Sequence, residues 1–60
     1  MVEIIVLRDR LEASREVWKK KQAAAEEGGE ETTYFYAKGI IYGLTIAIRE
    51  IGILLRVERA

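Results

Sequence analysis

The segment Tyr34–Val57 is apolar around most of its circumference when it is drawn as a helix at about 100° per residue. A helix with so few polar positions must be covered on nearly all sides by other protein. In a chain of 60 residues the remaining sequence can supply only one further helix of similar length. The segment therefore predicts a helical partner inside the chain and an apolar surface left over after the two helices pack. Its polar positions form one narrow arc: Lys38, Thr45, Arg49, Gly52 and Arg56.

A helix is also predicted before this segment, from about Glu3 to Glu27. Its first residues, Val2–Leu7, are rich in β-branched side chains, which also suit a short strand. We expect them to be helical, because a single strand would have no neighbouring strand to pair with. Apolar residues recur along this helix at spacings of three and four, the helical period: Ile4, Leu7, Leu11, Trp18 and Ala25.

Two consecutive glycines, Gly28 and Gly29, separate the two helices. Glycine just past the last periodic residue is the usual stop signal of a helix, and a Thr32 or Thr33 hydroxyl suits the N-cap of the next one. Two helices of similar length joined by a short turn form an antiparallel hairpin. The predicted fold is all-α and consists of one domain, residues 1–60, with helices at about 3–27 and 31–58 and a turn at 28–30.

The apolar surface of the second helix divides into two stripes. We call the first the ridge, because its members are mostly large: Ala37, Ile41, Leu44, Ile48, Ile51 and Leu55. We call the other the groove, because it contains small residues: Tyr36, Gly39, Gly43, Ala47, Glu50 and Leu54. Interdigitated packing pairs large side chains with small ones. We therefore expect the groove to face the first helix, with Trp18 in the space over Gly39.

On this assignment the ridge has no partner inside the chain. A contiguous apolar patch of this kind usually marks an interaction surface, and burying each large aliphatic side chain contributes roughly 1.5–3 kcal/mol. The sequence therefore predicts self-association through the ridge, with two hairpins forming a four-helix bundle.

Four polar or aromatic residues have predicted roles as well. Glu50 lies in the groove, level with the Arg8 guanidinium, so we expect a buried Glu50–Arg8 ion pair that fixes the register. The side chains of Tyr34 and Tyr42 lie at or beside the polar arc, and aromatic residues are enriched at recognition surfaces. These two tyrosines are candidates for contact with a partner protein.

Binding to a membrane or to nucleic acid is disfavoured. Gly39-x-x-x-Gly43 matches the close-packing motif of membrane helices, but the uncharged stretch that contains it, residues 39–48, is ten residues long, whereas a span needs roughly 20. Lys19–Lys21 beside Trp18 resemble a basic patch with an aromatic residue. The net charge of the whole chain is zero, however, so phosphate neutralisation is a weak driving force.

Enzymatic chemistry is also disfavoured by the composition. Histidine and cysteine are absent, and Ser14 and Asp9 are the single residues of their types, so no set of nucleophile, base and orienting group can be assembled. The carboxylates around the turn match no calcium loop, so no metal or cofactor is expected. The N-terminus lacks the basic and apolar regions of a signal peptide, which favours the cytoplasm.

No motif identifies a protein family. The predicted function is that of a small non-enzymatic interaction or structural protein, a homodimer that acts as an adaptor or inhibitor of a larger protein. The alternative is a dimer that binds nucleic acid weakly through Lys19–Lys21.

Overall fold

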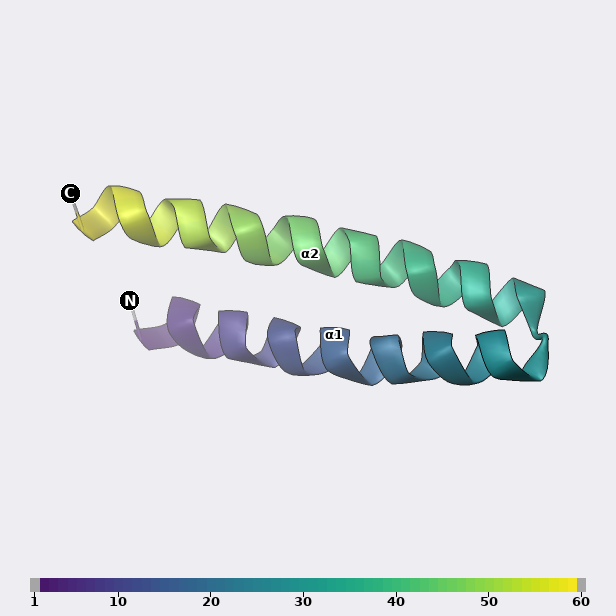
Figure 1. The fold of residues 1–60 in the computed structure, drawn as a ribbon. Helices are drawn as coiled ribbons and strands as arrows, with labels where there is room; N and C mark the ends of the chain where they lie inside the picture. Colours follow the sequence, from purple (N-terminus) through teal and green to yellow (C-terminus); the bar gives the residue numbers. More distant parts are fainter. Residues whose placement is uncertain (1, 60) are drawn as a thin grey trace.

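The computed structural model describes residues 2–59, and the side chains of residues 2–57. It contains two helices, α1 (Val2–Gly28) and α2 (Glu31–Arg59), which run antiparallel so that both ends of the chain lie together, far from the turn (Figure 1). The all-α hairpin is confirmed, and the helix bounds lie within one residue of the predicted ranges. Residues 2–7 are helical. Met1 and Ala60, which the predicted domain includes, lie outside the described residues.

The turn between the helices is a complete Schellman motif centred on Gly29. Gly29 has a φ of 69°, in the left-handed region that favours glycine. The amide of Glu30 donates a hydrogen bond to the carbonyl of Ala25 at 2.9 Å, and the amide of Gly29 donates one to the carbonyl of Glu26 at 3.3 Å. The carbonyl of Glu30 then accepts the first bond of α2, from Tyr34 at 2.9 Å. Glu30 is thus the N-cap, and the predicted threonine caps lie inside the helix.

The helix–helix contact corrects the predicted assignment of the two stripes. Ala37 and Leu55 of the ridge are 0% and 6% exposed, and α1 is the helix available to cover them. The other ridge residues are half-buried. In the groove, by contrast, Gly43 is exposed, and a Cβ added at Gly39 would meet no atom within 4 Å, so Trp18 does not occupy that space. The ridge therefore packs against α1, and the groove points outward.

The physical reason for this reversal is the amount of apolar surface that each stripe can bury. The ridge offers several large aliphatic side chains, each worth roughly 1.5–3 kcal/mol when fully buried. The groove offers two glycines and would bring the Glu50 carboxylate into the contact, where a charge is costly. Packing the ridge inward buries more apolar area and leaves Glu50 in solvent.

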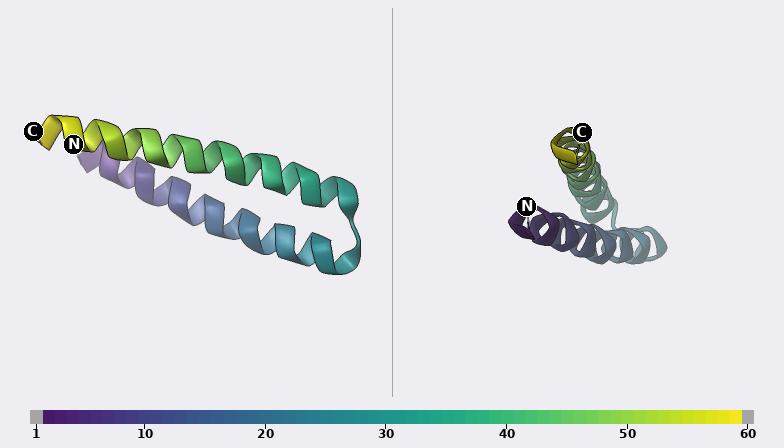
Figure 2. Two further views of the ribbon diagram at one scale, coloured as in Figure 1. Left: turned by 45° about the horizontal axis from the view of Figure 1, so that its top comes forward. Right: turned by 90° about the vertical axis from the view of Figure 1, so that its left-hand side faces the viewer.

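The hairpin is elongated and has almost no core. Its principal extents are 47 × 15 × 11 Å, and Figure 2 shows two inclined helices with no third layer over them. Its radius of gyration is 14.1 Å, whereas a compact domain of this length would have about 10 Å. Among the described residues only Ala25, Ala37 and Leu55 are buried. Two of these are alanines, so the hairpin alone buries little apolar side-chain volume.

Candidate interaction surface

Trp18 of α1 and Tyr36 of α2 bring the two helices together on one side of the hairpin. Their ring centroids lie 5.8 Å apart in an edge-to-face arrangement, with an interplanar angle of 67°. Because these side chains meet, the flank of α1 that carries Trp18 and the flank of α2 that carries Tyr36 belong to the same face. This ring contact therefore identifies which outward stripes of the two helices lie next to each other.

The two flanks have the same residue spacing. The flank of α1 carries Leu7, Ser14, Trp18 and the buried Ala25. The flank of α2 carries the groove residues Tyr36, Gly43, Ala47 and Leu54. At 3.6 residues per turn, intervals of seven, four and seven keep each set on one stripe. Together the two flanks form an outward surface that we call the apolar face. It is defined by six residues: Leu7, Trp18, Tyr36, Gly43, Ala47 and Leu54.

The apolar face is accessible in the single chain. Leu7 is 49% exposed, Leu54 47% and Tyr36 65%. Large residues lie at its two ends, whereas Gly43 and Ala47 lie near its middle. A Cβ added at Gly43 would meet no atom within 4 Å, so the surface there is open. The face thus has bulky ends and a low centre.

The opposite side of the hairpin is polar. It carries the arc predicted from the sequence, including Lys38, Thr45 and Arg56, all of them exposed. The Thr45 hydroxyl donates to the carbonyl of Ile41 at 2.8 Å, so it is satisfied within its own helix. Gly52 lies in this arc and also has open space where a side chain would be. The two sides of the hairpin therefore differ in polarity, although the exposed Glu50 lies in the groove along the apolar side and Tyr42 and Ile53 are exposed outside it.

The predicted Glu50–Arg8 pair is corrected by the structure. Glu50 is exposed, and the Arg8 guanidinium lies 3.7 Å from the carboxylate of Asp9 instead. Since the ridge is turned inward, Glu50 points away from α1.

Two arginines at the helix–helix contact have an environment that the sequence does not predict. The Nε atoms of Arg8 and Arg15 are buried and have no hydrogen-bond partner among the described residues. The two residues are one heptad apart, so they lie on the same stripe of α1. Their aliphatic stems can cover apolar surface while part of the guanidinium stays wet. A buried donor without an acceptor nevertheless destabilises the contact.

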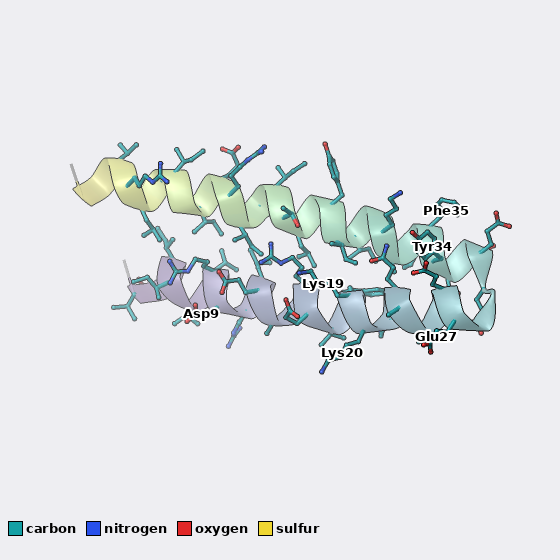
Figure 3. The ribbon with its side chains drawn as sticks, in the orientation of Figure 1. Asp9, Lys19, Lys20, Glu27, Tyr34 and Phe35 are labelled. Carbon is teal, nitrogen blue, oxygen red and sulfur yellow. The ribbon has the colours of Figure 1, made fainter. Side chains whose placement is uncertain are left out.

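The three lysines of α1 project in different directions. The Lys19 ammonium lies 3.5 Å from the Glu16 carboxylate, and that of Lys21 lies 4.3 Å from the centre of the Trp18 ring. Figure 3 shows Lys20 on the side of α1 away from α2, whereas Lys19 lies on the side toward it. The run is therefore divided around the helix and forms no single basic surface.

The two tyrosines proposed as a partner surface lie apart. Tyr34 contacts the ring of Phe35, with centroids 5.3 Å apart, and both residues line a shallow pocket beside the turn together with Glu26, Glu30 and Glu31. Tyr42 is 71% exposed and lies about two turns further along α2. The structure therefore does not unite them into one site.

The turn end of the hairpin is acidic. Glu26, Glu27, Glu30 and Glu31 follow one another around the turn, and all are exposed. Within residues 2–59 no group of three or more acidic, histidine or cysteine side chains is arranged to hold a metal ion. Neither α1 nor α2, over the residues described, has a stretch long and apolar enough to cross a membrane.

The comparisons with known proteins give no family for this chain. No protein-family model, no curated protein and no solved structure matches it.

Proposed function

We propose that the chain is a small interaction module that works as a homodimer, in which two hairpins pack through the apolar face to form a four-helix bundle. The observation that carries this proposal is the near absence of a core. Among the described residues only Ala25, Ala37 and Leu55 are buried, and no large side chain is fully so. Domains of this size are marginally stable alone and usually gain stability from a disulfide, a metal or a partner chain. The sequence has no cysteine or histidine, which leaves the partner chain.

The exposed area of the hairpin supports a partner of the same size. A compact monomer of 6.9 kDa exposes about 4,000 Å². The hairpin exposes 4706 Å², which is about 700 Å² more. A stable interface of standard size buries about 800 Å² on each partner. Covering the apolar face with a second hairpin would bring the exposed area per chain into the normal range.

The proposed role is structural, as a dimeric adaptor or inhibitor that presents its polar faces to a larger protein. Nucleic-acid binding is the weaker proposal. A nucleic-acid footprint needs several cations on one surface. Lys19 is paired with Glu16, Lys21 lies over Trp18, and Lys20 projects to another side of α1.

A matched pair of glycine substitutions tests the dimer. Gly43→Glu places a carboxylate at the centre of the apolar face, whereas Gly52→Glu places one on the polar face of the same helix. A Cβ at either position meets nothing within 4 Å, so the hairpin itself has room for both. Both changes also raise helix propensity. Any difference between them therefore reports on what covers each face.

Light scattering after size-exclusion chromatography gives the mass of each variant. We expect the parent and Gly52→Glu to be dimers. Gly43→Glu should weaken dimerisation by at least about 100-fold, because burying an unpaired carboxylate costs several kcal/mol. A parent chain that stays monomeric and helical at millimolar concentration, or a Gly43→Glu variant that dimerises like the parent, would refute the proposal.

A further inference from the structure

We infer that the two hairpins of the dimer pack with their turns at opposite ends, so that the turn of each chain lies beside the open end of its partner. This inference rests on the proposed dimer and specifies how its two hairpins are oriented. The occupant of the apolar face is a second copy of this chain, related by a two-fold axis perpendicular to the long axis of the hairpin.

The charge distribution along the hairpin selects this orientation. Glu26, Glu27, Glu30 and Glu31 give the turn end a formal charge of −4 without a single basic residue between them. The open end is balanced, because residues 3–10 and 50–59 together carry four acidic and four basic side chains. Turns at the same end would place eight exposed carboxylates side by side. Turns at opposite ends keep the two acidic turns apart and place each beside an open end with no net charge, so this repulsion between like charges is avoided.

The shape of the apolar face suits the same two-fold axis. Ser14, Gly43 and Ala47 lie near the midpoints of α1 and α2, where the axis would pass. Their small side chains let the helices of the two copies approach each other closely. With the turns at opposite ends, Trp18 and Tyr36 of one copy pack against Leu7 and Leu54 of the other. Aromatic rings then meet aliphatic side chains on both sides of the axis.

Distances between spin labels test the orientation, because the chain has no cysteine and each label site can be introduced singly. Glu27→Cys places a nitroxide at the turn end of α1, and Ala13→Cys places one near the middle of the same helix. Both positions are exposed and lie outside the apolar face. Double electron–electron resonance then measures the distance between the two labels of each dimer.

With turns at opposite ends, the Glu27 labels are separated along the bundle by about 24 residues of helix, or roughly 36 Å. The Ala13 labels should be at most about 25 Å apart, since each helix with its side chains is about 10–12 Å across. A short distance at both sites would overturn the orientation and leave the dimer standing. A monomeric mass with no dipolar signal at Ala13 would refute the dimer itself and the orientation with it.

Discussion

Replacing Leu55 should destabilise the protein much more than replacing its neighbour Leu54. The two residues have the same side chain and lie next to each other on α2, but Leu55 is 6% exposed and Leu54 is 47% exposed. Leu55 belongs to the ridge, which packs against α1, whereas Leu54 belongs to the apolar face. Substituting each by alanine changes helix propensity equally, so this contribution cancels in the comparison.

The size of the difference follows from burial. Truncating leucine to alanine removes three carbons, each worth about 0.8 kcal/mol when buried. At Leu55 nearly all of this is lost, and the cavity left behind raises the cost to about 3 kcal/mol. At Leu54 only about half of the side chain is covered, and the site opens to solvent, so the cost should be about 1 kcal/mol. The variants should then differ by roughly 10 °C in melting temperature.

Circular dichroism during thermal unfolding measures this difference, with parent and both variants at the same protein concentration. Leu54→Ala should also become more costly relative to the parent as the protein concentration rises, because Leu54 contributes to the proposed dimer contact and mass action then applies. A Leu54→Ala variant that melts below Leu55→Ala at every concentration would show that the ridge does not face α1. The assignment of both stripes would then be wrong.

Two further matched pairs test the turn and the buried arginine by urea unfolding. Gly29→Ala should cost about 1–2 kcal/mol, because a residue with a Cβ is strained at φ 69°, whereas Gly52→Ala should stabilise by about 0.5–1 kcal/mol; equal effects would contradict the Schellman geometry. Arg15→Leu should stabilise by about 1 kcal/mol, because it removes a buried donor without an acceptor and adds apolar contact. Arg10→Leu, at an exposed position of the same helix, should change stability by less than about 0.5 kcal/mol. A stabilisation shared by both leucine variants would point to a general effect of apolar substitution and not to the Arg15 donor.

The secondary structure of this chain follows directly from its sequence. Apolar residues with helical spacing define α1 and α2, and consecutive glycines allow only a short turn between them. Gly29 takes the left-handed conformation that ends a helix, while Gly28 is still helical. These signals are local, so a single sequence is enough to read them.

The rotation of each helix about its own axis is harder to predict than the secondary structure, because α2 is apolar on two sides. Periodicity shows the ridge and the groove but does not show which of them faces α1. Matching large side chains to small ones favours the groove and places Trp18 opposite Gly39. Total buried apolar area favours the ridge, and this second effect dominates in the structure. A comparison of the two areas, with the charge of Glu50 included, would have pointed to the observed packing.

The apolar face is also visible in the sequence, although matching large side chains to small ones assigns it to the inner surface. Both helices repeat the intervals seven, four and seven, and a spacing shared by the two arms of a hairpin suggests that they build one surface together. The unpartnered Nε of Arg15 was harder to foresee. Its position on the inner stripe depends on which side of α1 faces the ridge, and that is a tertiary property.

The elongated shape has a consequence for hydrodynamic measurements. A hairpin with principal extents of 47 × 15 × 11 Å is elongated and has a larger Stokes radius than a sphere of equal mass, so it would leave a gel-filtration column earlier than its mass implies. A second hairpin beside it doubles the mass while adding width and almost no length. The proposed dimer is therefore the less asymmetric particle, and its elution volume should differ from that of one chain by less than a doubling of mass normally produces.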